Sequence, residues 1–199
     1  MTILIGICGE IGSGKSTIAD YLKSCGFDEY SFAKPVKDLA MAMGFTYKEV
    51  WGTQKEKITK NKYWGISGRE FLQKFATQIG RELMPKIIPN MDMGKSNSPW
   101  IRLFEIYWNE LLNNNGLHHS NLVVSDVRFP DEAKSIQEQG GYIIRIIRPG
   151  LIKNGVEHTH KSETNIDKID VDAVIINDKS KEELFNIIEK LISNIVLFG

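Results

Sequence analysis

The sequence predicts an α/β fold in which a mostly parallel β-sheet carries helices on both faces. Short apolar runs of strand length alternate along the chain with longer segments whose apolar residues recur at helical spacing. A glycine-rich loop, Gly9–Thr17 (GEIGSGKST), joins the first apolar run to the first helical segment. A later apolar run ends in Asp126, at the carboxyl end of a predicted strand, where open α/β sheets bind their ligands. At 199 residues the chain has the length of one such domain.

The strands are predicted from apolar and β-branched runs that are bounded by Gly, Pro or polar residues. The first run, residues 2–8, is apolar almost throughout, which is typical of a strand buried on both faces in a parallel sheet. The same pattern predicts a short strand that ends at residues 30–32 and three more strands at 122–126, 142–147 and 171–176.

Helices are predicted between the strands from helical spacing and from start and stop signals. The predicted helices are residues 15–24, 35–44, 68–83, 99–112, 130–139 and 181–196. Pro85 and Pro89 are expected to break the chain after the third of them. Between residues 45 and 66 the pattern predicts only a helical turn near Tyr47–Trp51, followed by a loop.

Composition and charge argue against several classes of protein. The 25 basic and 25 acidic residues give a net charge of zero, so no global positive field attracts nucleic acid, and we expect no nucleic-acid partner. No apolar run reaches the roughly 18 residues of a membrane span, and the first run lacks the length and the basic flank of a signal peptide. We therefore expect a cytoplasmic protein with no membrane partner. The two cysteines, Cys8 and Cys25, lack the spacing of a metal site.

The glycine-rich loop fits the pattern GxxxxGK(S/T), with Gly9, Gly14, Lys15 and Ser16 at its defined positions. This pattern supplies backbone N–H groups that wrap phosphate oxygens, a lysine that reaches the β- and γ-phosphates, and a hydroxyl for Mg²⁺. Gly12 eases the turn further. The helix that begins near Lys15 adds the positive end of its dipole. The order of strand, loop and helix therefore predicts a phosphate-binding loop for a nucleoside triphosphate.

Charged residues near the ends of two later strands are candidates for phosphoryl-transfer chemistry. Asp126 is placed to orient Mg²⁺ through water or to engage an acceptor, and the alternative is a capping carboxylate before Pro130. Arg128 could bind an acceptor phosphate through two hydrogen bonds, or form a surface ion pair instead. Arg145 and Arg148 come late in a strand, where cations can stabilise the charge of a transferring phosphoryl group. A solvated strand end is their alternative.

Four stretches together resemble the deoxynucleoside monophosphate kinase family typical of phages and large DNA viruses. They are GEIGSGKST, SFAKPVKDLA, SGREFLQKFATQIGRE, and VVSDVRFPDEAKSIQEQGGYIIRIIRPG followed by HTHKSE. The likeness runs from about Leu4 to Asp178, and SDVRFPDEA is its most diagnostic part. It implies the three-layer sandwich of P-loop nucleoside triphosphatases. It also implies an enzyme that, with Mg²⁺, transfers the γ-phosphoryl group of ATP to a deoxynucleoside monophosphate. If the enzyme is viral, the reaction would take place in the cytoplasm of the host.

The resemblance also implies how a single kinase domain, residues 1–199, would be organised. A core of residues 1–33 and 117–199 would hold ATP. A helical insertion at about 34–116 would bind the monophosphate, and a lid at about 149–164 would close over both nucleotides.

The same resemblance implies roles for individual residues. Those implied for the ATP site are Gly12, Ser13, Gly14, Lys15, Ser16 and Thr17, with Ser16 on Mg²⁺ and Thr17 near the α-phosphate. Those implied for the monophosphate pocket are Lys37, Arg69, Gln73, Asp126 and Arg128. Those implied for catalysis are Lys15, Asp126, Arg128 and Arg148, of which Arg148 would act from the lid.

Two departures from the family pattern leave the base preference open. Ala76 stands where family members often carry a glycine, and residues 55–65 are distinct to this chain. The alternatives are a small-molecule kinase similar to phosphomevalonate kinase, which has a similar Asp-x-Arg after a strand, and a nucleotide sensor that binds ATP without transferring phosphate. A polynucleotide kinase fits the balanced charge less well. Whether the chain forms a homodimer is also left open.

Overall fold

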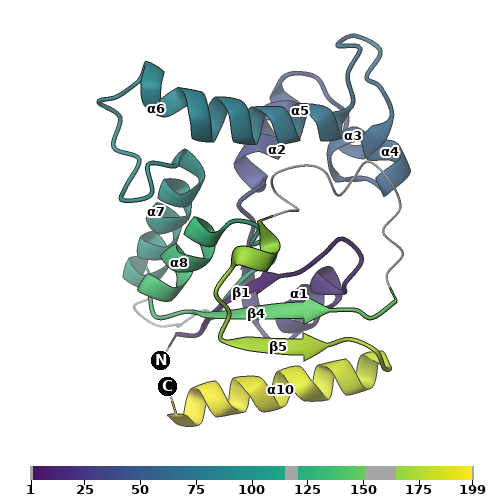
Figure 1. Cartoon of the computed structure of the whole chain (residues 1–199), viewed down its shortest axis with the longest axis vertical. Helices are drawn as coiled ribbons and strands as arrows, with labels where there is room; N and C mark the ends of the chain where they lie inside the picture. The colour runs from purple at the N-terminus through teal and green to yellow at the C-terminus, as the bar shows by residue number, and fades with distance from the viewer. Residues whose placement is uncertain (1, 115–120, 151–164, 199) are drawn as a thin grey trace. The chain divides into compact units, whose positions relative to one another are not determined.

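The computed structural model describes residues 2–114, 121–150 and 165–198, and its centre is a five-stranded parallel sheet (Figure 1). The strand order is β2-β3-β1-β4-β5, and every neighbouring pair runs parallel. The strands are β1 (Leu4–Cys8), β2 (Phe27–Tyr30), β3 (Asn121–Val124), β4 (Tyr142–Ile147) and β5 (Ala173–Ile176). The predicted α/β fold with a parallel sheet is thus confirmed.

The central strand β1 explains why the sequence forms a sheet covered on both faces. All five residues of Leu4–Cys8 are buried, and their side chains alternate between the two faces. Ile5 and Ile7 join one core cluster with residues of two helices, α1 (Lys15–Ser24) and α10 (Lys181–Phe198). Gly6 points to the opposite face, where a Cβ would lie 2.9 Å from Ile136 Cδ1 of α8.

Helices therefore lie on both faces of the sheet, as predicted. α1 contacts α10 on one face, and α8 (Pro130–Glu138) contacts β1 and β4 on the other. In Figure 1, α10 runs alongside β5 at the yellow end of the chain. A short 3₁₀ turn, η3 (Ile166–Lys168), precedes β5. None of the helices in the described part of the chain is long and apolar enough to cross a bilayer.

The chain forms two compact units. One contains residues 1–31 and 105–199 and holds the sheet, and the other is the helical unit of residues 32–104. The helices of the second unit are α2 (Lys34–Ala42), α3 (Tyr47–Trp51), α4 (Gln54–Ile58), α5 (Gly68–Lys74), a π-helix η1 (Phe75–Leu83) and α6 (Met84–Ile87). α7 (Pro99–Asn114) begins in this unit and continues into the first. A lid at residues 149–164 stays a prediction, because nearly all of it lies outside the described residues.

Side-chain caps and a small apolar core define the start of the helical unit. Ala40, Phe45 and Val50 form the buried core. α3 begins with a capping box in which Thr46 and Glu49 bond each other's backbone N–H groups, and Thr53 with Glu56 repeats the device on α4.

Three predictions about elements were wrong. β2 covers Phe27–Tyr30 and stops before residue 32. The prediction relied on an apolar run, and this edge strand lacks one because edge strands can carry exposed charged residues. α4 occupies part of the predicted loop, and its capping box was the overlooked signal. Pro85 does not break the chain, since it lies in the first turn of α6, where no N–H is needed.

The π-helix η1 is packed against the start of α7. The Trp100 indole Nε1 donates to the Ala76 carbonyl at 2.8 Å. Gly80 makes room for the ring, because a Cβ there would lie 2.2 Å from Trp100 Cζ2. The indole thus bonds a carbonyl inside the wider π turn, and this contact explains why the stretch is not a regular α-helix.

Candidate active site

The glycine-rich loop Gly9–Thr17 connects the buried strand β1 to helix α1 at the carboxyl end of the sheet. Gly9 has a φ of 144°, and a Cβ at this position would lie 2.4 Å from the Ile146 carbonyl oxygen of β4. Gly14 has a φ of 107° and immediately precedes the first residue of α1. Both positions require glycine, because other residues rarely adopt these angles. The loop is therefore a tight turn seated directly on the sheet.

Lys15 and the first turn of α1 give this loop its positive character. The Lys15 Nζ donates to the carbonyl oxygens of Gly9 and Glu10, each at 2.7 Å, so the ammonium spans the loop. The first turn of α1 contains no acidic residue, and Gly14 provides no side-chain cap. Its N–H groups and the helix dipole are available to an anion. Ser16 is exposed and Thr17 is half-buried in this turn.

Ser13 is a buried polar residue at the turn of the loop. Its side chain is 1% exposed, and within the described part of the chain its Oγ has no hydrogen-bond partner. Its backbone N–H donates to the Glu10 carbonyl at 3.1 Å and closes the turn. A buried hydroxyl without a partner is costly unless a ligand or water satisfies it.

Asp126 lies at the same carboxyl end of the strands, just beyond β3. The preceding residue, Ser125, donates its N–H to the Tyr30 carbonyl of β2, and the following residue, Val127, donates to the Ile7 carbonyl of β1. The carboxylate accepts a hydrogen bond from Ser31 Oγ at 2.7 Å. Burial, with the charge of Asp126 as the next cause, raises the pKa of Tyr30. Asp126 therefore lies between the ends of β1 and β2, directly after β3, which neighbours the strand that leads into the loop.

Arg128 and Arg148 also belong to the unit that holds the sheet. Arg128 is half-buried before α8, and its backbone N–H donates to the buried Glu132 carboxylate at 2.8 Å. Glu132 also accepts from the Phe129 N–H at 3.1 Å, so this carboxylate caps α8. Arg148 directly follows β4 and is exposed. The start of α8 is thus capped by the Glu132 carboxylate.

Arg145 is a structural residue rather than a solvated strand end. Its guanidinium Nη2 donates to the carbonyl oxygens of Ile166 and Ile169, each at 2.8 Å, and so ties η3 to β4. It also lies near the buried Cys8, where burial raises the pKa of the thiol and the arginine partly opposes this. Sequence spacing could not distinguish this role from a cation at a site, because the two carbonyls lie more than 20 residues away.

Asn177 contacts the glycine-rich loop and was not among the residues predicted from the sequence. It follows β5 directly, and its Nδ2 donates to the Ser13 carbonyl oxygen at 2.8 Å. The available signal was its place at the carboxyl end of the last strand, which is where the phosphate-binding loop and Asp126 also lie.

The residues predicted for the monophosphate pocket on the insertion lie on two helices that contact each other, α2 and α5. The Lys37 ammonium lies 3.9 Å from the centre of the Trp51 ring. The Arg69 guanidinium donates to the Gln54 side-chain oxygen. Gln73 is half-buried one turn further along α5. The structure thus pairs Lys37 with the Trp51 ring and Arg69 with Gln54.

Residues 55–65 comprise most of α4 and a turn around Asn61. The Asn61 side chain is buried and accepts hydrogen bonds from the N–H groups of Tyr63 and Trp64, at 2.9 and 3.1 Å. Its Nδ2 donates to Glu49 at 3.0 Å. Burial would raise the pKa of Glu49, but hydrogen bonds from Thr46 and Asn61 outweigh it, so the pKa is lowered. The turn leaves Tyr63 and Trp64 exposed.

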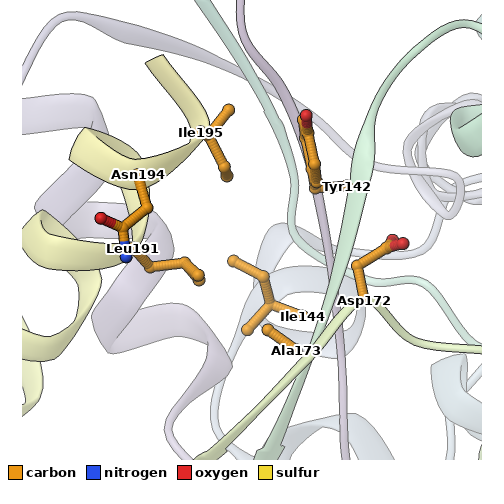
Figure 2. A pocket seen from close by; sticks show the side chains of 7 residues that line it. All are labelled: Tyr142, Ile144, Asp172, Ala173, Leu191, Asn194 and Ile195. Carbon is orange, nitrogen blue, oxygen red and sulfur yellow. The ribbon is translucent and has the colours of Figure 1, made fainter. Parts of the chain in front are cut away.

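A separate pocket lies at the opposite end of the strands and is not part of this site (Figure 2). Its volume is about 400 Å³, and Figure 2 shows side chains from β4, β5 and α10 around it. They are Tyr142, Ile144, Asp172, Ala173, Leu191, Asn194 and Ile195. Tyr142 and Ala173 are the first residues of their strands, so the pocket is at the amino ends of β4 and β5. Among the described residues, no cluster of three or more His, Cys, Asp or Glu side chains could hold a metal ion by itself.

Comparison with protein families gives a match over most of the chain. The family model described as deoxynucleotide monophosphate kinase matches residues 46–188. The match includes Asp126, Arg128 and Asn177, whereas the glycine-rich loop precedes it.

Individual relatives extend the match to nearly the whole chain. A protein of Acanthamoeba polyphaga mimivirus, assigned by name to the deoxynucleotide monophosphate kinases, is 36% identical over 96% of this chain and 97% of its own. The deoxynucleoside-5'-monophosphate kinase of Escherichia phage T5 is 25% identical over 83% of this chain and 86% of its own. The deoxynucleotide monophosphate kinase of Escherichia phage RB69 is 25% identical over 95% of this chain and 99% of its own.

Solved structures share the fold. Dephospho-CoA kinase from Campylobacter jejuni superposes with a TM-score of 0.51 at 18% identity, covering 98% of both chains. A protein from Thermus thermophilus gives the same TM-score at 17% identity, covering 97% of both chains. At this identity the likeness concerns the fold alone.

Proposed function

Because the chain belongs to the deoxynucleotide monophosphate kinase family, we propose that it transfers the γ-phosphoryl group of ATP to a deoxynucleoside monophosphate and releases the diphosphate and ADP. The observation that carries the proposal is the loop between β1 and α1, in which Lys15 spans a tight glycine turn at an uncapped helix N-terminus. An arrangement of this kind suits a chain of phosphates because each of its donors can reach a different oxygen.

The ATP site consists of the loop and the first turn of α1. Its residues are Gly12, Ser13, Gly14, Lys15, Ser16 and Thr17. Lys15 exchanges its two carbonyl partners for phosphate oxygens, and the N–H groups of the first turn bind the same phosphates. The unpaired Ser13 hydroxyl supports this assignment, since a bound phosphate can satisfy it.

Ser16 and Asp126 fit the binding of Mg²⁺ because both offer oxygen atoms, the ligands this ion prefers. Ser16 would hold the ion through its hydroxyl, and Asp126 would orient it through its carboxylate. Bound Mg²⁺ would neutralise charge on the β- and γ-phosphates. The Ser31 hydroxyl keeps one Asp126 oxygen in place, so the carboxylate is oriented before any ligand arrives.

The residues proposed to bind the monophosphate are Lys37, Arg69, Gln73, Asp126 and Arg128. Lys37, Arg69 and Gln73 belong to the helical unit, and Asp126 and Arg128 belong to the sheet unit. The arginines bind the acceptor phosphate through paired hydrogen bonds, because guanidinium geometry matches two phosphate oxygens. The ring of Trp51 under Lys37 supplies an apolar surface beside this charge.

Catalysis by these residues is a matter of position and charge. The acceptor phosphate already carries its nucleophilic oxygen, so the transfer needs no strong protein base. Lys15, Arg128 and Arg148 stabilise the negative charge of the transferring phosphoryl group, while Asp126 orients the reactants. Each fixed cation is worth more in the transition state than in the ground state, because charge builds up on the equatorial oxygens.

A coupled assay of ADP release tests the proposal. The purified chain is supplied with Mg-ATP and, one at a time, dTMP, dGMP, dCMP and dAMP, their ribose forms, and phosphomevalonate. We expect turnover with at least one deoxynucleotide. Lys15→Ala lowers kcat by about 10²- to 10³-fold, the usual effect of removing one oriented cation or donor. Lys23→Ala, an exposed lysine on the same helix, is the matched control and keeps wild-type activity.

The other outcomes separate the alternatives. Turnover with phosphomevalonate only would replace the nucleotide acceptor by a small-molecule one. Binding of ATP without ADP release for any acceptor would identify a sensor and refute the kinase.

A further inference from the structure

Asn177 joins the end of the last strand to the phosphate-binding loop. Its backbone N–H donates to the Ile147 carbonyl at 2.7 Å, which fixes the residue to the end of β4. Its side-chain Nδ2 donates to the Ser13 carbonyl at 2.8 Å, across 164 residues of sequence. The residue is half-buried, so this hydrogen bond is partly shielded from water.

The bond acts on the peptide unit between Ser13 and Gly14. No cis peptide bond occurs in the described part of the chain, so this unit is trans. In a planar trans peptide the C=O and the N–H point in opposite directions. A donor on the Ser13 oxygen therefore directs the Gly14 N–H away from Asn177. It also polarises the peptide, which strengthens that N–H as a donor.

Steric contact locks the same unit. Gly14 has a φ of 107°, and a Cβ on it would lie 2.5 Å from Asn177 Nδ2. The amide thus rests against the Gly14 Cα, at the residue that precedes α1. The positive φ of Gly14 and the position of Asn177 depend on each other, because any side chain at residue 14 would displace the amide.

We propose that Asn177 is a positioning residue for ATP: it orients the Ser13–Gly14 peptide of the phosphate-binding loop and thereby sets the affinity for the triphosphate. This inference rests on the proposed function only in that the loop binds ATP. Asn177 contacts the loop at Ser13, next to the start of α1, and is not among the residues assigned to the monophosphate. Its loss therefore changes the response to one substrate and not to the other.

Two substitutions test this inference. Asn177→Leu keeps most of the side-chain volume and removes the donor. Asn177→Asp keeps the shape and places an acceptor oxygen against the Ser13 carbonyl. We expect Asn177→Leu to raise the KM for ATP by about tenfold, the equivalent of one hydrogen bond, with the KM for the deoxynucleotide within about twofold of wild type. Asn177→Asp raises the KM for ATP further, because its charge also opposes the phosphates.

Asn186→Leu, an exposed asparagine of α10, is the matched control and leaves both constants unchanged. Calorimetric binding of a non-hydrolysable ATP analogue repeats the comparison without turnover, and thermal unfolding shows whether each variant is folded. If Asn177→Leu does not fold, Asn177→Asp decides the question.

Three results are decisive. Wild-type affinity for the analogue in a folded Asn177 variant overturns the proposal. So does an equal rise in both KM values, since a general structural defect would cause it. If the wild-type chain binds the analogue but phosphorylates no acceptor, the proposed function fails, while a selective loss of analogue affinity in Asn177→Leu still supports the role of Asn177.

Discussion

Asp126 is held at the end of the sheet by contacts on both of its sides. Its two sequence neighbours bond β2 and β1, and its carboxylate accepts from Ser31. The side chain is therefore oriented by backbone positions that the sheet itself determines, which is the condition for precise electrostatic action on a substrate. The Glu132 carboxylate caps the start of the helix that follows.

Asp126→Asn tests this residue. The change keeps the shape and the capacity to accept from Ser31 but removes the charge, so we expect kcat to fall by about 10²-fold or more while the unfolding midpoint stays close to wild type. Steady-state kinetics and thermal unfolding measure the two effects. Glu29→Gln, a carboxylate that accepts from the neighbouring Ser125, is the control and retains activity. Wild-type kcat with a lower unfolding midpoint would assign Asp126 a structural role instead.

At the scale of elements, the helical unit depends on short helices with strong caps. α3 and α4 have only five residues each, too few to be stable as isolated helices. The Glu49 carboxylate compensates by accepting from the N–H and hydroxyl of Thr46 and from the Asn61 amide. One side chain thus caps α3 and holds the turn that contains Tyr63 and Trp64.

This arrangement predicts a response to acid. The folded-state pKa of Glu49 is below its ordinary value of 4.5, so folding favours the charged form. The resulting stability is fully present above about pH 4.5 and is lost as the pH falls through the lower folded pKa. Glu49→Gln should therefore lower the unfolding midpoint at neutral pH and lose less further stability in acid than wild type does. Thermal unfolding between about pH 6 and pH 3 measures this.

Glu110→Gln, on the exposed surface of α7, is the control for this experiment and should follow the wild-type curve. Parallel curves for Glu49→Gln and wild type would contradict the assigned role of Glu49.

At the scale of the whole molecule, the residues assigned to ATP all belong to the sheet unit, and the helical unit contributes only residues assigned to the monophosphate. The phosphate-binding loop and Asn177 belong to the sheet unit, whereas Lys37, Arg69 and Gln73 belong to residues 32–104. Such a division lets each nucleotide be bound by its own set of side chains. It also means that the substrates should leave separate footprints on the chain.

Hydrogen–deuterium exchange measures these footprints. We expect a non-hydrolysable ATP analogue to slow exchange in the loop and the first turn of α1, and a deoxynucleoside monophosphate to slow it in α2 and α5, because ligand contacts oppose local opening. The unphosphorylated deoxynucleoside is the matched control ligand and should protect α5 less, since it cannot engage Arg69. Protection by the monophosphate in the sheet unit alone would contradict the assignment of Lys37, Arg69 and Gln73.

The sequence by itself determined the architecture of the sheet unit and the identity of the loop. Apolar runs and helical periodicity are local patterns, and they place β1, α1, β4 and α8 to within a residue or two of the structure. The glycine pattern of Gly9–Thr17 is equally local. The roles of Lys15, Asp126 and the other predicted site residues follow from the same motifs and from family resemblance, and they stay predictions until activity is measured.

Only the tertiary structure decided what holds these parts in place. Asn177 on the Ser13 carbonyl, Arg145 on the carbonyls of η3, and Asn61 on Glu49 are bonds between residues far apart in sequence. Such bonds produce no periodic pattern in the sequence, because they depend only on where the fold places the two bonded groups. The sequence therefore identifies the glycine-rich loop, and the fold identifies the residues that contact it.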